Sequence, residues 1–129
     1  MKTALELLKA YLDNVQDAEA ASSLFAEDGA LELSYLSTVG WPARAEGPKE
    51  IKKFLETVLT TFSDFKFHDL KIFIDTNDQV FGEYEVSTAV TATGMEYHQL
   101  YMGRLVAENG KIKQLCEALD TASTANAFA

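Results

Sequence analysis

The sequence predicts an α+β fold, a cone-shaped curved antiparallel sheet wrapped around N-terminal helices and one long helix. Three observations lead to it. Apolar residues follow a helical spacing in the first half, the period changes to two after Phe62, and short turn signals separate the later segments. Helices followed by hairpin-linked strands are typical of an antiparallel sheet covered on one face. At 129 residues the chain is expected to form one domain, residues 1–129.

The first segment is helical. Thr3 and Glu6 have the spacing of a capping box, in which each side chain bonds the other residue's backbone N–H. One apolar stripe follows at Leu5, Leu8, Leu12 and Val15. Asp17 can cap a second short helix that carries Ala21, Leu24 and Phe25.

The middle of the chain predicts a strand, a loop and the longest helix. Asp28-Gly29 is a turn signal, a strand follows over residues 30–36, and a loop over residues 37–46 contains Trp41 between Gly and Pro. The helix begins after Gly47, with Pro48 in its first turn, where a missing N–H costs little. Its apolar face comprises Ile51, Phe54, Leu55, Val58, Leu59 and Phe62.

Four strands close the fold, at residues 65–75, 80–93, 96–107 and 111–120. Their turns are Asn77-Asp78, Gly94 and Asn109-Gly110, and the last is typical of a tight hairpin. A curved sheet with helices across its concave side leaves a conical cavity between them.

Charge and composition exclude several classes of partner. The net charge is −9, which argues against nucleic acid and anionic membranes, because both bind cationic surfaces. The single cysteine, Cys116, excludes an internal disulfide and is typical of a reducing cytoplasm. No signal peptide or membrane-spanning run is expected, and we expect a cytoplasmic protein.

Glu117 is the most informative residue. On a period of two it shares a strand face with Leu115 and Leu119, so it is carried into the core with them. A buried carboxylate without a cation is costly, and its pKa rises. Such groups are common where proton transfer takes place. The alternative is a structural acid that hydrogen bonds Tyr101 or Gln99.

Aligning the strands at Gly94 predicts which side chains share the inner face. The wall is mostly apolar with a few polar groups, which is how small-molecule sites are built. Its members are Val86, Thr88, Val90, Ala92, Gln99, Tyr101, Gly103, Leu105, Leu115, Glu117 and Leu119. Phe54 is expected to complete it from the helix, with Leu33 and Tyr35 from the first strand.

Other chemistry-bearing residues have competing interpretations. Trp41 is either a pocket lid or a dimer contact. His68 and His98 lie on different strands without metal-ligand spacing, so no metal site is predicted. Cys116 faces away from Glu117 and is interpreted as a packing residue. No phosphate-binding loop is present, and no cofactor is expected.

The order of several segments resembles the nuclear transport factor 2-like superfamily, in its SnoaL-like and ketosteroid isomerase-like branches. These segments are Leu24-Phe25-Ala26-Glu27-Asp28-Gly29-Ala30, Arg44-Ala45-Glu46-Gly47-Pro48-Lys49-Glu50-Ile51 and Asn109-Gly110-Lys111-Ile112. The segments at His68–Phe73, Tyr101 and 110–117 are similar to the phenazine biosynthesis A/B proteins, which implies that Glu117 is an acid/base. The two aspartates of ketosteroid isomerase itself correspond to Leu33 and Gly103.

Two functions remain open. The first is a cofactor-free isomerase, cyclase or condensing enzyme that acts on an apolar ring or carbonyl compound, with Glu117 moving a proton and Tyr101 and Gln99 orienting the substrate. The second is a non-catalytic ligand-binding or scaffold domain. A homodimer is expected, because the outer sheet face is apolar. This predicted face comprises Ala89, Leu100, Met102, Val106, Ile112 and Cys116.

Overall fold

The computed structural model describes all 129 residues and has the predicted α+β class. In chain order the elements are α1 (Ala4–Asp13), α2 (Ala18–Ser22), β1 (Phe25–Ser34), the 3-10 helix η1 (Leu36–Val39), β2 (Arg44–Glu46), α3 (Gly47–Thr61), β3 (Phe62–Ser63), β4 (Phe67–Asp75), β5 (Gln79–Val90), β6 (Glu96–Glu108), β7 (Lys111–Leu119) and α4 (Thr121–Ala127).

Local sequence signals set the helix starts. Thr3 and Glu6 form both hydrogen bonds of the predicted capping box, and the Asp17 side chain accepts a bond from the Ala20 N–H at the start of α2. Pro48 lies in the first turn of α3, as expected. The predicted apolar stripe of α3 is buried at Ile51, Leu55 and Val58.

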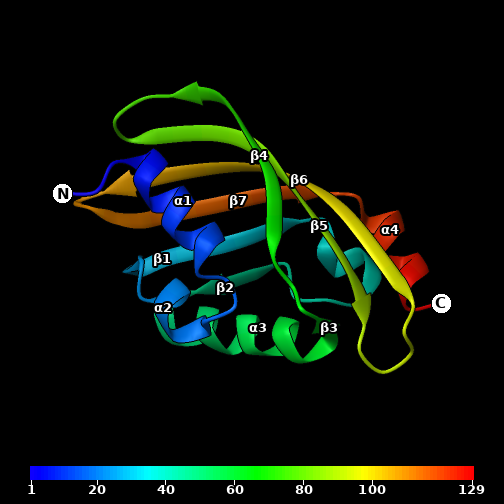
Figure 1. The fold of residues 1–129 in the computed structure, drawn as a ribbon. Helices are drawn as coiled ribbons and strands as arrows, with labels where there is room; N and C mark the ends of the chain where they lie inside the picture. Colours follow the sequence, from blue (N-terminus) through cyan, green and yellow to red (C-terminus); the bar gives the residue numbers. More distant parts are fainter.

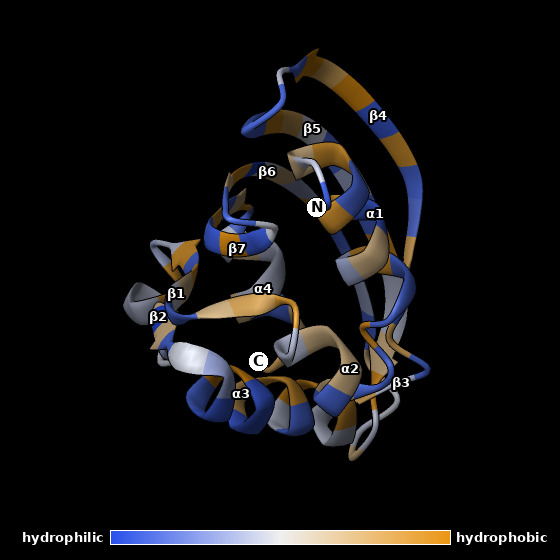
Figure 2. Cartoon of the chain, turned by 90° about the vertical axis from the view of Figure 1, so that its left-hand side faces the viewer, coloured by the Kyte–Doolittle hydropathy of each residue, from blue (hydrophilic) through white to orange (hydrophobic).

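The sheet curls strongly around the helices (Figure 1). Its strand order is β2-β1-β7-β6-β5-β3, and β4 also pairs with β5. In Figure 2 the sheet curves from β1 through β7, β6 and β5 to β4, while α2 and α3 lie across the open side. This arrangement gathers the apolar side chains of helices and strands in one core inside the curve.

One strand pair departs from the antiparallel expectation. β1 runs parallel to β7, with Leu31 opposite Leu115 and Leu33 opposite Glu117, whereas every other pair is antiparallel. No hairpin joins these two strands, so no turn fixes their relative direction, and turn signals in the sequence could not reveal it.

Several boundaries also differ from expectation. Phe25 begins β1 instead of ending the second helix, and β2 forms within the expected loop. The Ala/Ser/Thr-rich C-terminal segment folds into α4, because the Asp120 side chain caps it by accepting from the N–H groups of Ala122 and Ser123. A register shift between Val106 and Ala107 turns Ile112 into the core, so it is not on the outer face.

None of the helices is both long and apolar enough to cross a membrane.

Candidate functional site

Glu117 lies inside the curled sheet, as the alternation on β7 predicts. It is opposite Leu33 on one neighbouring strand and Gly103 on the other, and only 2% of its surface is exposed. Leu115, two residues earlier, is fully buried on the same side. The apolar residues of β7 therefore hold a carboxyl group in the core.

Burial changes the acidity of this carboxyl group. Loss of water raises the pKa of Glu117 from 4.5 to about 7, while a hydrogen bond from the Tyr84 hydroxyl acts in the opposite direction. No basic side chain contributes to this shift. Desolvation outweighs the single neutral donor, so Glu117 can hold or release a proton near neutral pH.

The hydrogen bond to Tyr84 leaves one carboxyl oxygen free. The Tyr84 hydroxyl donates to Oε2 of Glu117 over 2.5 Å, and Oε1 has no partner within the protein. Neither Tyr101 nor Gln99 donates to Glu117, contrary to the expected alternatives. Because Glu117 also lines a cavity, Oε1 is the oxygen available to a bound molecule.

Gly103 explains how Tyr84 reaches across a strand. Tyr84 is on β5 and Glu117 on β7, with β6 between them. A Cβ atom at Gly103 of β6 would lie 2.2 Å from the Tyr84 hydroxyl oxygen. The absent side chain therefore provides the space in which the phenol contacts the carboxylate. Sequence reasoning missed Tyr84, although its parity with Val86 placed it on the inner face.

Aromatic rings surround the pair. Tyr84 and Tyr101 stack at 5.8 Å between ring centroids, and Phe67 contacts both edge-on at 5.1 and 5.6 Å. Burial, followed by the negative field of Glu117, raises the pKa of Tyr11 well above its ordinary value, and burial is also the main cause of the raised pKa values of Tyr84 and Tyr101. These phenols stay protonated at neutral pH and can act as donors.

The cavity at Glu117 is apolar and narrow. Its free volume is about 40 Å³, whereas a buried water needs roughly 10–15 Å³. Glu117 is its only charged side chain. The complete lining is Leu33, Leu36, Trp41, Phe54, Leu55, Val58, Phe62, Phe65, Phe67, Tyr97, Tyr101, Glu117, Leu119 and Thr124.

The structure brings together part of the predicted pocket wall. Trp41, Phe54, Tyr101 and Leu119 line the cavity with Glu117. Four apolar residues of the predicted wall lie instead in the packed core behind the lining: Val86, Val90, Leu105 and Leu115. They support the cavity without contacting its interior.

Tyr35 does not line the cavity, so that prediction is wrong. Its side chain is 74% exposed. β1 ends at Ser34, and Tyr35 has a left-handed φ of 66°, which breaks the alternation that would turn it inward.

Gln99 is buried, but its side chain hydrogen bonds the backbone at the start of α4. Its Nε2 donates to the Asp120 carbonyl oxygen and the Tyr97 hydroxyl, both over 2.9 Å, and its Oε1 accepts from the Asp120 N–H over 2.8 Å. These bonds occupy its amide group. Gln99 therefore fixes the β7–α4 junction rather than pointing a free amide at Glu117.

A second polar constellation lies on the outside of the sheet. His68 Nδ1 contacts Asp69 Oδ2 at 2.8 Å, and His68 Nε2 contacts the Ser87 hydroxyl at 3.3 Å. This is the order of groups in a serine nucleophile triad. All three are exposed and lie outside the Glu117 cavity, so we interpret the contacts as support for the local β-bulge.

The remaining candidates do not join the site. Cys116 is half-buried and contacts the Ser34 hydroxyl at 3.6 Å, on the strand face opposite Glu117. His98 is 3.7 Å from Glu96 on the exposed face of β6. No group of three or more His, Cys, Asp or Glu side chains is placed to hold a metal ion.

Comparison with known proteins identifies the fold family. The profile of the SnoaL-like domain matches residues 8–115, which is most of the chain. The chain belongs to the SnoaL-like domain family. No curated protein matches this SnoaL-like sequence.

Solved structures share the SnoaL-like fold at low sequence identity. A proposed isomerase from Bacillus subtilis has a TM-score of 0.85 and 21% identity, over 97% of this chain and 91% of its own. A phenazine biosynthesis-related protein from Pseudomonas aeruginosa has a TM-score of 0.82 and 22% identity, over 96% and 83%. TerC, crystallised with polyporic acid, has a TM-score of 0.80 and 18% identity, over 96% of each chain.

Proposed function

We propose that this SnoaL-like protein is a cofactor-free acid–base enzyme, an isomerase, cyclase or condensing enzyme, acting on an apolar ring or carbonyl compound. One observation carries the proposal. Glu117 is a buried carboxyl group with a pKa of about 7, held by Tyr84 through one oxygen, with the other oxygen free beside an apolar cavity. A pKa near the working pH is what general acid–base catalysis requires.

The proton transfer follows from this geometry. Ionised Glu117 takes a proton from a carbon next to a substrate carbonyl through Oε1, and the protonated carboxyl returns it to another atom of the same molecule. Tyr84 donates to Oε2 throughout and stabilises the carboxylate before the first step and after the second. Tyr101, a protonated phenol in the cavity wall, is proposed to orient or polarise the carbonyl group.

The similar structures are consistent with a small-molecule ligand. TerC was crystallised with polyporic acid. The lining of the Glu117 cavity, in which twelve of fourteen residues are hydrophobic, has the chemistry that a flat apolar ring requires.

A non-catalytic ligand-binding or scaffold domain is the alternative, and the size of the cavity favours it. About 40 Å³ is well below the roughly 300–1,000 Å³ of most ligand pockets. In that case Glu117 and Tyr84 are a buried polar pair that fixes the packing of β5, β6 and β7, and no ligand reaches Oε1.

The protein is also proposed to work as a cytoplasmic homodimer without nucleic-acid partners. Its net charge of −9 disfavours polyanions. Leu100 and Met102, which are 40% and 44% exposed on the outer face of β6, favour a second copy as the partner.

Deuterium exchange tests the acid–base proposal before a natural substrate is known. Cyclohexenone and indanone are incubated with the protein in heavy water, and loss of their α-proton signals is followed by NMR. We expect exchange that increases with the ionised fraction of Glu117, with an apparent pKa near 7. Glu117→Gln should lower the rate by about 10²–10⁴-fold.

The matched control is Glu85→Gln. Glu85 is next to Tyr84 on β5 but pairs with His68 and Leu100 and faces away from the cavity. Its replacement should leave the exchange rate unchanged. Equal rates for wild type and Glu117→Gln would contradict the enzymatic proposal and favour the scaffold domain.

A further inference from the structure

A second hollow lies directly outside the Glu117 cavity. This outer groove has a volume of about 310 Å³ and is lined by Trp41, Pro42, Arg44, Ala45, Glu50, Lys53, Phe54 and Thr57. Trp41 and Phe54 line both the groove and the inner cavity. These two aromatic side chains therefore form the partition between a polar surface groove and the buried carboxyl group.

The partition is built from a loop on one side and a helix on the other. Phe54 comes from α3, and its ring meets Trp41 edge-on at 6.4 Å between centroids. Trp41 follows η1, whose two flanking residues, Tyr35 and Gly40, both have left-handed φ angles. A Cβ atom at Gly40 would meet nothing within 4 Å, so the backbone conformation and not crowding requires the glycine.

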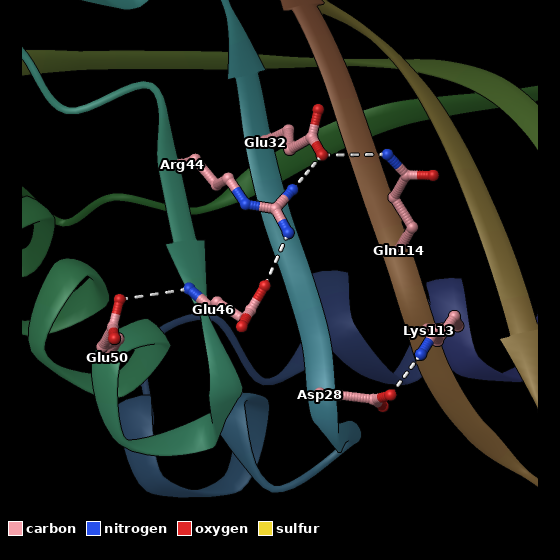
Figure 3. A network of polar contacts seen from close by, with 7 residues as sticks. All are labelled: Asp28, Glu32, Arg44, Glu46, Glu50, Lys113 and Gln114. Atoms are coloured by element: carbon pink, nitrogen blue, oxygen red, sulfur yellow. Dashed lines mark hydrogen bonds and ion pairs between the residues drawn. The ribbon is translucent and has the colours of Figure 1, made fainter.

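The two basic side chains of the groove differ in whether they form ion pairs. Arg44 is held by Glu32 and Glu46, and the Glu50 side chain accepts from the Glu46 N–H, as Figure 3 shows. Lys53 also lines the groove but forms no ion pair. Lys53 is thus a basic side chain without an ion-pair partner beside the Trp41–Phe54 partition, in a protein of net charge −9.

We propose that the ligand is an elongated amphipathic acid, with an apolar ring in the inner cavity and an anionic group in the outer groove at Lys53. Its linker passes between Trp41 and Phe54. The inner cavity alone is too small for a ring, so these side chains move apart when the ligand binds. This inference rests on the proposed function for the reaction of the ring at Glu117. The anionic, amphipathic character of the ligand is inferred from the outer groove.

Trp41 provides a direct readout, because it is the only tryptophan in the chain. Its fluorescence is titrated with phenylpropanoate, an anion, and with phenylpropanol, which has the same ring and linker without the charge. We expect both to change the emission and phenylpropanoate to bind more tightly, by about threefold to fivefold, the size of a partly exposed ion pair.

Two lysine variants locate the anion. Lys53→Gln should remove the preference for phenylpropanoate and leave phenylpropanol binding unchanged. Lys49→Gln, on the same helix but outside the groove, should retain the preference. Equal affinity for the two probes in the wild type, or no emission change with either, overturns the inference.

The outcome is separable from the proposed function. If charge selection fails while Glu117-dependent deuterium exchange persists, the class of ligand is wrong and the acid–base chemistry stands. If selection by Lys53 holds while exchange is absent, the groove binds an amphipathic acid in a protein that does not catalyse proton transfer.

Discussion

The acidity of Glu117 is decided by two opposing effects at a single carboxyl group. Burial disfavours the charged form, and the Tyr84 hydroxyl partly replaces the lost water. Each pKa unit corresponds to about 1.4 kcal/mol, so the rise from 4.5 to about 7 costs the folded protein about 3 kcal/mol when Glu117 is ionised.

This cost has a definite pH dependence. Below pH 4.5 the carboxyl is protonated in both folded and unfolded chains, and no penalty applies. Between pH 4.5 and 7 only the unfolded chain releases the proton, so the free energy of unfolding falls as the pH rises; above pH 7 the loss is constant.

Glu117→Gln should remove this penalty. The free energy of unfolding of the variant relative to wild type should rise by about 3 kcal/mol between pH 4 and pH 8. Urea denaturation across the pH range measures it, with Glu85→Gln as the control. A constant difference between the Glu117 variant and wild type would mean that the carboxyl is not desolvated.

The Tyr84 hydrogen bond can be removed in two ways. Tyr84→Phe deletes the hydroxyl, and Gly103→Ala places a Cβ atom where the hydroxyl lies. Because this bond lowers the pKa of Glu117, both variants should raise it above 7. Each should also cost about 1–3 kcal/mol of stability. Carbon-13 NMR titration of the Glu117 carboxyl measures the shift, and an unchanged or lower pKa in Tyr84→Phe would contradict the arrangement.

Strand alternation was sufficient to predict some of these residues. It identified Glu117, because three consecutive inward positions of β7 leave no other place for its side chain. It placed Gln99 inside but could not show that the amide is used by α4, since that contact depends on a helix outside the strand pattern. It failed at Tyr35, where one left-handed backbone angle ends the alternation.

At the scale of elements, α4 depends on one buried amide. Both the N–H and the carbonyl oxygen of Asp120 bond Gln99, and the Asp120 side chain caps the helix. Thr124 of α4 lines the Glu117 cavity, so this junction also positions part of its wall.

Gln99→Leu should therefore loosen α4 without changing Glu117. Two backbone groups lose their partners, at a cost of roughly 1–3 kcal/mol each, whereas Asp120→Ala removes only the cap and should cost about 1 kcal/mol. Amide exchange at residues 120–124 should accelerate more in the Gln99 variant. Equal exchange rates in the two variants would mean that the Asp120 cap alone, and not the Gln99 hydrogen bonds, stabilises the start of α4.

Helices and strands were predicted where their signals lie within their own segment, and were missed where they depend on contacts with distant segments. α3 and the hairpins from β4 to β7 have signals within their own segments, namely helical spacing, Pro48 and Asn109-Gly110, and these elements were predicted. The parallel pairing of β1 with β7 and the inward turn of Ile112 at a register shift arise from contacts between distant segments. No local pattern records them.

At the scale of the whole molecule, the outer face of the sheet predicts a dimer. Leu100 and Met102 are exposed there, beside a groove of about 350 Å³ that Ala118 also lines. Met102→Asp should convert a dimer of twice 14.2 kDa into a monomer, as measured by sedimentation. Met95→Asp removes a methionine of similar exposure at the β5–β6 turn and should leave the dimer intact.

The parallel pair of β1 and β7 also affects how the chain can fold during synthesis. The Gln114 amide of β7 donates a hydrogen bond to the Glu32 carboxylate of β1, 82 positions earlier in the chain, and Glu117 is also on β7. Ribosomes release the chain from its N-terminus, so β1 emerges long before its partner and must wait with one edge unpaired. The Glu117 carboxyl group is part of β7, so it leaves the ribosome together with the strand that completes the sheet. A nascent chain therefore has no acid in its core until its sheet can close.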